Sequence, residues 1–213
     1  MDDLKLAAYM AIALVPAFVL HEYAHAFVSV RLGDPTPKRF GRLTLNPRPS
    51  IDPFGSLILP ALTLILVASG SLLLPVFAYA KPMPVDPMAF KNPRRDYAWV
   101  ILAGLVANLA LTIPAGILIR IGVSGEAFLF AISWVLVNAF MFGLQLMPIP
   151  GLDGSKLLAP FLPPRAREVY ANLDQYLVLF ILVIFFLLAG PLFAIVNAFA
   201  NLACRLAAGL PCF

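Results

Sequence analysis

Residues 4–30 read LKLAAYMAIALVPAFVLHEYAHAFVSV, a run that is apolar over most of its length. A helix rises about 1.5 Å per residue, so a helix of this length crosses the hydrocarbon core of a bilayer. Ionisable side chains are costly at that depth, yet His21, Glu22 and His25 stand together in this run. The sequence therefore predicts a membrane helix that carries a functional site.

The three side chains form an HExxH pattern. His21 and His25 are four residues apart, so they share one helix face and can ligate one Zn²⁺, with Glu22 beside them as general base. The chain has 2 histidines, and both lie in this pattern. We interpret the cluster as a zinc site. The alternative is a polar patch near a helix end, which leaves three costly groups without a partner.

The composition is that of an integral membrane protein. Of the 213 residues, 62% are hydrophobic and 12% are charged. At about 20 residues per span there is room for five or six membrane segments, and no length remains for a sizeable soluble domain. The net charge of +4 is modest, and no basic tract is interleaved with aromatic residues. We expect the lipid bilayer as surroundings and no nucleic-acid partner.

Five hydrophobic segments predict an all-α polytopic fold. They span residues 4–30, 57–79, 97–119, 127–147 and 177–200. We expect a single membrane-embedded domain over residues 1–213.

Within this domain we expect a catalytic core at about residues 4–160 and a C-terminal transmembrane helix at about 173–203. The first segment is too long, and its start too acidic, for a cleavable signal peptide. Cys204 and Cys212 lie near the C-terminal end, where they form a disulfide or stay free.

The second hydrophobic segment departs from a helical pattern. Ser69-Gly70-Ser71 interrupts it, and residues 72–84 contain three prolines. We expect a turn followed by a re-entrant, extended, β-like segment, because thirteen extended residues reach about 43 Å and the membrane core is about 30 Å thick. The alternation of apolar and polar residues over 42–46 predicts a second piece of extended chain, a short strand or hairpin.

The distribution of basic residues supports the re-entrant segment. With it, twelve of the 15 lysines and arginines fall on one face and three on the other, whereas five simple crossings give eight and seven. By the positive-inside rule the face with twelve is cytoplasmic. The protein is then a multi-pass protein of the cell membrane with cytoplasmic basic loops, and its active site lies within the membrane toward the cytoplasmic side.

A catalytic zinc takes three protein ligands and keeps a fourth position for water. The best further candidate is Asp153, in the stretch PIPGLDG over residues 148–154. The prolines and glycines end the preceding helix there, and broken membrane helices often bind ions. Asp153 could instead cap the next short helix. With a two-histidine site that lacks a ligand, we favour the metal.

Two asparagines lie inside apolar segments. Asn108 and Asn138 either form hydrogen bonds between helices or bind a carbonyl group of a substrate.

Several motifs occur in a fixed order along the chain. They are HExxH at 21–25, LNP at 45–47 with IDP at 51–53, AKPMPV at 80–85, AGLVANL at 103–109 and PIPGLDG at 148–154. In these motifs the chain resembles the site-2 protease family of intramembrane zinc metalloproteases. The resemblance covers about residues 10–160 and leaves no room for a PDZ-like or CBS-like domain, so it implies a minimal bacterial-type core.

The resemblance implies one zinc ion per chain, bound by His21, His25 and Asp153, with Glu22 as catalytic base. It also implies that the segment beginning at Ala80, Lys81 and Pro82 lines the site as an edge strand for the substrate. Gln145 stands where the family usually has asparagine, so a longer amide binds the substrate or Asn138 shares the role.

The function implied is an intramembrane zinc endopeptidase that cleaves transmembrane segments of single-span membrane proteins, as in regulated intramembrane proteolysis. Two alternatives are a catalytically silent homologue that binds membrane helices, and a metal-handling membrane protein. The silent homologue is expected to lose Glu22 or a ligand, and the metal-handling protein is expected to carry further ligands along a pore. The chain retains the base and has no further histidine.

Overall fold

The computed structural model describes residues 2–70 and 78–173, and scattered positions between 176 and 205. Three described helices are long and apolar enough to cross a membrane: α1 (Asp2–Arg31), α4 (Pro93–Arg120) and α5 (Gly125–Leu146). Each lies within a few residues of a segment predicted from hydropathy. The described residues contain no β-strand, which confirms the all-helical class.

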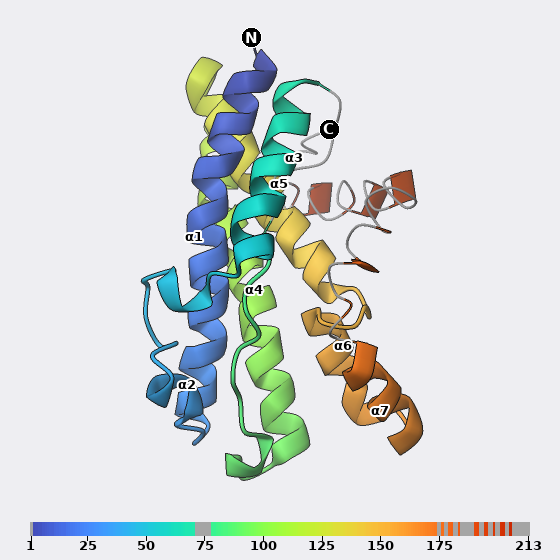
Figure 1. Ribbon diagram of the computed structural model, residues 1–213. Coiled ribbons are helices and arrows are strands. Elements are labelled where there is room, and N and C mark those ends of the chain that lie inside the picture. Colours follow the sequence, from blue (N-terminus) through green and yellow to red (C-terminus); the bar gives the residue numbers. More distant parts are fainter. Residues whose placement is uncertain are drawn as a thin grey trace.

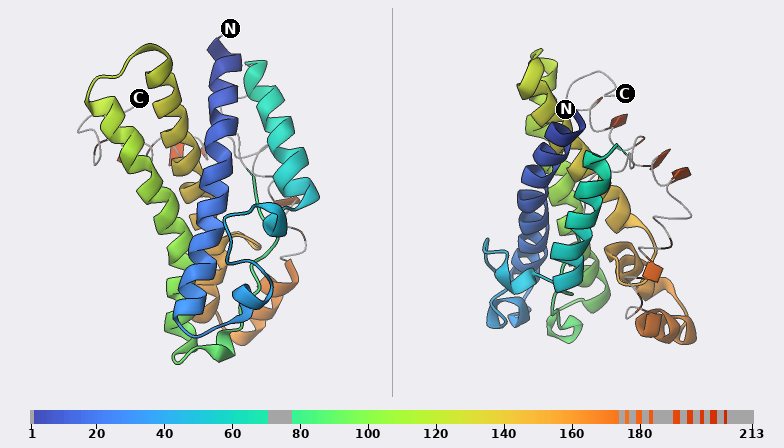
Figure 2. Two further views of the ribbon diagram at one scale, coloured as in Figure 1. Left: turned by 90° about the vertical axis from the view of Figure 1, so that its left-hand side faces the viewer. Right: turned by 45° about the horizontal axis from the view of Figure 1, so that its top comes forward.

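The three long helices pack against one another, and α3 (Leu59–Ala68) lies beside α1 (Figures 1 and 2). Small residues on α1 allow this close packing, because Ala7, Ala13 and Ala17 are almost fully buried. Phe140 and Met141 of α5 fill the core between these helices. The bundle therefore buries several polar residues between its helices, among them His21, Asn108 and Asn138.

The second hydrophobic segment forms a shorter helix than predicted. A π-helical turn (Pro53–Ile58) leads into α3, and Asp52 accepts hydrogen bonds from two backbone N–H groups at its start. The helix ends at Ala68. Gly70 then adopts a φ of +69°, which confirms the turn predicted at this point.

Residues 78–86 run beside the long helices toward the start of α4 (Figure 1). These residues are not helical, which agrees with the prediction. Single hydrogen bonds, rather than a strand ladder, join them to the rest of the protein. Residues 72–77 of the predicted segment lie outside the described residues. The re-entrant crossing therefore stays a prediction.

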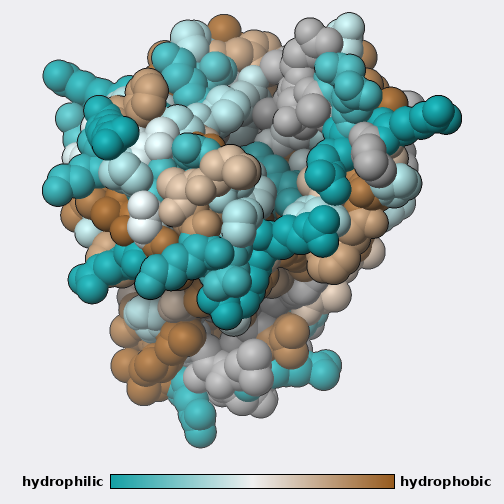
Figure 3. Space-filling model, turned by 90° about the horizontal axis from the view of Figure 1, so that it is seen from below, coloured by the Kyte–Doolittle hydropathy of each residue, from teal (hydrophilic) through white to brown (hydrophobic). Residues whose placement is uncertain are grey.

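Short helices occupy the end of the molecule away from the N-terminus (Figure 1). They are α2 (Thr36–Arg39), 3-10 turns at Arg48–Ser50, Pro87–Ala89 and Ala159–Phe161, α6 (Asp153–Leu158) and α7 (Pro164–Leu173). Hydrophilic side chains gather over this end (Figure 3).

The predicted strand or hairpin at residues 42–46 is wrong. The backbone N–H groups there form local hydrogen bonds. Thr44 N–H donates to the Arg42 carbonyl, and Asn46 N–H donates to the Thr44 hydroxyl. Such local hydrogen bonds compete with strand pairing. Arg42 is also buried rather than solvent-facing, which no alternation pattern predicts.

The predicted C-terminal helix and the possible disulfide concern residues that lie mostly or wholly outside the described part. Most of the predicted C-terminal helix falls there, as do both Cys204 and Cys212. A total of five or six spans remains a prediction.

Candidate metal centre

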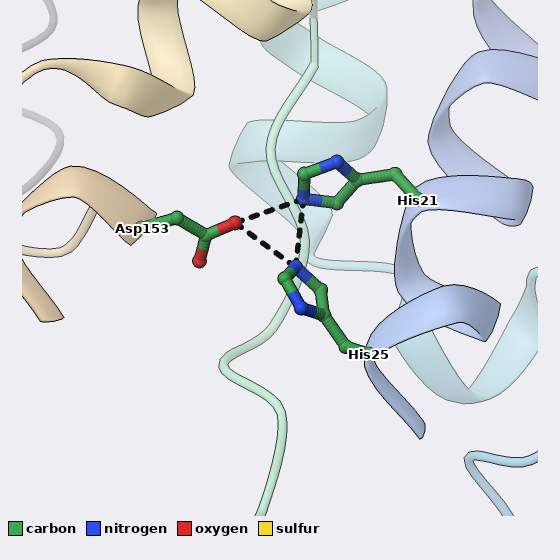
Figure 4. A group of neighbouring side chains, drawn as sticks. All are labelled: His21, His25 and Asp153. Carbon is green, nitrogen blue, oxygen red and sulfur yellow. Dashed lines mark hydrogen bonds and ion pairs between the residues drawn. The ribbon is translucent and has the colours of Figure 1, made fainter. Parts of the chain in front are cut away.

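Three buried side chains from two distant parts of the chain converge on one point (Figure 4). His21 Nε2 and His25 Nε2 lie 3.0 and 2.9 Å from Asp153 Oδ2, and the two nitrogens are 2.9 Å apart. Their side chains are 3%, 4% and 6% exposed. The predicted ligand set is thus assembled in space, although 128 residues separate His25 from Asp153.

The chemistry of this group fits a cation. His25 Nδ1 lies 2.7 Å from the Val100 carbonyl oxygen and donates to it, which leaves the lone pair on Nε2. That lone pair faces the Nε2 atom of His21 and a carboxylate oxygen. A nitrogen lone pair and a carboxylate oxygen repel each other at 2.9 Å unless a proton or a metal cation lies between them. Histidine nitrogens with one carboxylate oxygen are a donor set that zinc takes in catalytic sites.

The broken end of α5 brings Asp153 to the histidines. The helix stops at Leu146, and Gly151 adopts a φ of +87°, which turns the chain back. Gln145 Oε1 accepts the Asp153 N–H at 3.2 Å. Asp153 is the first residue of α6, its side chain does not cap that helix, and its carboxylate points to the histidines.

Gly104 allows α4 to approach the site. A Cβ built at this position would lie 2.3 Å from His25 Nε2 and 2.8 Å from His21 Cε1. No other residue type fits there without displacing an imidazole.

Lys156 holds the second oxygen of the carboxylate. Its Nζ lies 3.1 Å from Asp153 Oδ1, one turn along α6, while both histidines face Oδ2. One oxygen of Asp153 is thereby directed to the candidate metal and the other to a lysine, a support typical of metal ligands.

Glu22 lines a cavity of about 90 Å³ beside this group. The lining also includes His25, Asp153, Gln145 and Lys156. Glu22 Oε2 is buried and has no hydrogen-bond partner among the described residues. The guanidinium of Arg42 lies beside this oxygen, with Nη2 3.8 Å from Glu22 Oε2.

The non-helical segment forms one wall of the same cavity, through Ala80, Lys81, Pro82, Met83 and Val85. On its far side Tyr79 N–H donates to the Gly55 carbonyl and Lys81 N–H donates to the Ser50 carbonyl. Ala80, between them, forms no hydrogen bond with the described residues. Its backbone groups thus point away from residues 50–55.

Asp34 anchors the end of this segment by accepting from Asp86 N–H at 3.0 Å. Burial alone would raise the pKa of Asp34. Hydrogen bonds from Thr36, Asp86 and the Ser29 hydroxyl outweigh burial, and they hold the pKa below its usual value. The anchor is therefore a charged carboxylate.

The two asparagines lie elsewhere. Asn108 and Asn138 are fully buried in the helix bundle, and neither lines the cavity. Asn138 Nδ2 donates to the Trp134 carbonyl of its own helix. The side-chain amide atoms of Asn108 have no hydrogen-bond partner among the described residues.

Sequence reasoning missed Gly104, Lys156 and Arg42 as parts of this site. A lysine three residues after a candidate ligand on a helix was a usable signal, because such residues are neighbours. The sequence held no comparable signal for the other two, since their roles depend on distances between separate elements.

Known proteins resemble this chain along most of its length. The protein named putative zinc metalloprotease YwhC, from Bacillus subtilis, is 36% identical over 192 residues, which cover 85% of this chain and 82% of YwhC. The putative zinc metalloprotease Rip2 of Mycobacterium tuberculosis is 36% identical over 177 residues, or 78% of this chain and 62% of Rip2.

The Rip2 protein of Mycolicibacterium smegmatis is 35% identical over 173 residues, or 78% of this chain and 61% of that protein. The chain thus spans about three fifths of the length of its Rip2 relatives. No protein-family model matches the chain. No solved structure matches it.

The names of these relatives and the buried histidine–aspartate group together support zinc as the metal. The identity to YwhC extends over more than four fifths of both chains, and on this ground the protein belongs to the zinc metalloprotease family that includes YwhC.

Proposed function

We propose that this protein is an intramembrane zinc endopeptidase of the site-2 protease type, which cleaves transmembrane segments of single-span membrane proteins. One observation carries the proposal. The buried group of His21, His25 and Asp153, with Glu22 beside it, lies in a bundle of helices of membrane-spanning length and opens into a cavity.

Each side chain has a role in this proposal. His21, His25 and Asp153 would hold one zinc ion, which supplies a water of lowered pKa and polarises the scissile carbonyl. Glu22 would accept a proton from the attacking water and donate it to the leaving amine. Glu22 lines the cavity next to His25 and Asp153, a position that suits this exchange.

The substrate would bind as an extended strand. A transmembrane helix hides its carbonyl groups in its own hydrogen bonds, so it must unwind before it is cut. Pairing with Ala80, whose backbone groups have no partner among the described residues, offsets part of that cost. Lys81, Pro82 and Gln145 line the same cavity and would contact the strand. Asn108 and Asn138 remain further candidates, reached only by a rearrangement.

The end of the molecule that carries α2 and α7 would face the cytoplasm. Hydrophilic side chains cover this end (Figure 3). Lys38 and Arg39 of α2 and Arg94 at the start of α4 are exposed basic residues, which favours the cytoplasmic side. The active site would then lie in the membrane toward the cytoplasmic side, in a multi-pass protein with five or six segments.

A cleavage assay tests the function. The purified protein in lipid vesicles is incubated with a panel of single-span substrates, some of which carry helix-breaking residues in the span. Zinc is measured in the wild type and in Glu22→Gln. We expect zinc in both proteins and cleavage only by the wild type, favoured by helix breakers.

Cleavage by Glu22→Gln at the wild-type rate would show that Glu22 is not the base. A wild type that contains zinc and binds the substrates, but cleaves none of them, would favour a silent helix-binding homologue.

A further inference from the structure

Arg42 is buried although it is one of the twelve basic residues that the charge pattern assigns to a single face. Only 5% of the residue is exposed. Its guanidinium donates to three backbone carbonyls, those of Pro49, Lys81 and Pro82, the last at 3.1 Å. A buried arginine that binds carbonyls from two segments fixes their separation, because its donors form a rigid planar fork.

The carbonyls need this donor because the chain around them is rich in proline. Pro82 and Pro84 have no N–H group, so the wall of the cavity cannot form a continuous ladder with residues 49–56. Lys81 N–H donates to the Ser50 carbonyl, and no later backbone N–H of residues 82–85 donates to residues 49–56. Arg42 then supplies the donors that a neighbouring strand would supply elsewhere.

The same guanidinium faces the candidate base. Arg42 Nη2 lies 3.8 Å from Glu22 Oε2, an oxygen that is buried and has no hydrogen-bond partner among the described residues. The separation is too long for a direct hydrogen bond but is within the range of an ion pair. Arg42 thus stands between Glu22 and the carbonyls of the cavity wall.

We propose that Arg42 is a positioning residue that fixes the substrate-binding wall at Lys81 and Pro82 relative to Glu22. This inference rests on the proposed function. Ala80, which would pair with the substrate, is adjacent to Lys81, whose carbonyl Arg42 binds. The register of the bound peptide therefore depends on Arg42, and so does the distance from its scissile carbonyl to Glu22.

Three variants test the inference. Arg42→Ala removes the guanidinium, Arg42→Lys keeps the charge without the fork, and Arg48→Ala removes an exposed basic residue from the same loop as a matched control. Zinc content, cleavage kinetics, and hydrogen–deuterium exchange of peptides covering residues 78–86 are measured for each. Arg42→Ala is also assayed with added guanidinium chloride at low millimolar concentration.

We expect every variant to retain zinc, because Arg42 touches none of the three ligands. Arg42→Ala should lose about 10- to 100-fold in kcat/KM, as expected for buried hydrogen bonds to a charged group. Residues 78–86 should exchange faster in this variant. Guanidinium should restore part of the activity. Arg42→Lys should raise KM more than it lowers kcat, and Arg48→Ala should match the wild type.

Unchanged exchange at 78–86 and unchanged kinetics in both Arg42 variants would overturn the inference. Loss of zinc together with loss of activity, without rescue by guanidinium, would also overturn it, since Arg42 would then support the fold and not the register. The hydrogen–deuterium exchange of residues 78–86 tests the role of Arg42 even if the wild type cleaves no substrate. Absence of cleavage by the wild type would count against the proposed function and not against this inference.

Discussion

Gly104 of α4 lies so close to His25 of α1 that a Cβ at this position would stand 2.3 Å from Nε2. The distance between α1 and α4 is thus limited by contact with the metal-binding imidazole of His25. Glycine at this position is required by the site and not by the helix, in which alanine would be the better residue.

Gly104→Ala should therefore lower zinc content. The added methyl group must displace an imidazole, and we expect at least about a tenfold loss of zinc affinity, in the range found when the surroundings of a ligand are altered. Zinc is measured by mass spectrometry of metal per chain after dialysis against a chelator series. Gly190→Ala is the control, because a Cβ there meets no described atom within 4 Å. Normal zinc in Gly104→Ala would mean that α4 can move away without cost.

Lys156→Met should weaken zinc binding without abolishing it. The substitution keeps the length of the side chain but removes the contact of 3.1 Å to Asp153 Oδ1, so the carboxylate is free to rotate. Loss of such a support typically costs about 10- to 100-fold in metal affinity. Competition with a fluorescent zinc chelator measures it. Lys91→Met, on an exposed part of the chain, should behave as the wild type. Equal affinity in the two variants would remove Lys156 from the site.

The elements that could be predicted from the sequence are those whose signal is local. Hydropathy located α1, α4 and α5 to within a few residues, because a membrane helix is defined by its own composition. The spacing of His21 and His25 fixes their common helix face. Asp153 was identified by the need for a third ligand and by the proline-rich break before it.

The parts that were missed or wrong depend on contacts between segments. The alternation at residues 42–46 predicted a strand, yet the buried guanidinium of Arg42 and local hydrogen bonds of Thr44 hold that chain in turns. Gly104 has no local signal at all, since only the approach of α4 to the histidines makes it necessary. Propensity and alternation do not report such distances.

The protein should lose cleavage activity when the N–H group of Ala80, in the wall of the cavity, is removed. Ala80→Pro deletes a donor that has no partner among the described residues, so folding should be little affected while substrate pairing is weakened. Lys81→Pro deletes the N–H that donates to Ser50, and this change should destabilise the segment itself. Cleavage rate and thermal unfolding distinguish the two effects. Normal cleavage by a folded Ala80→Pro protein would show that the substrate does not pair there.

The start of α4 and the loop after α1 should lie on the same side of the membrane. Single cysteines at Lys38 and Asn92, both exposed, are labelled with an impermeant reagent in a variant that lacks Cys204 and Cys212. A cysteine at Ile121, beyond the other end of α4, serves as the opposite-side control. We expect positions 38 and 92 to react from the cytoplasmic side and position 121 from the other. Reaction of 38 and 92 from opposite sides would rule out the re-entrant segment.

Zinc content across four variants at the metal centre decides whether these residues form a catalytic zinc site. Each of His21→Ala, His25→Ala and Asp153→Ala removes one of three converging donor atoms, so each should lose most of the metal. Glu22→Gln removes the base and no ligand, so it should keep about one zinc per chain while losing cleavage. Full zinc occupancy in Asp153→Ala, or loss of zinc in Glu22→Gln, would contradict this assignment.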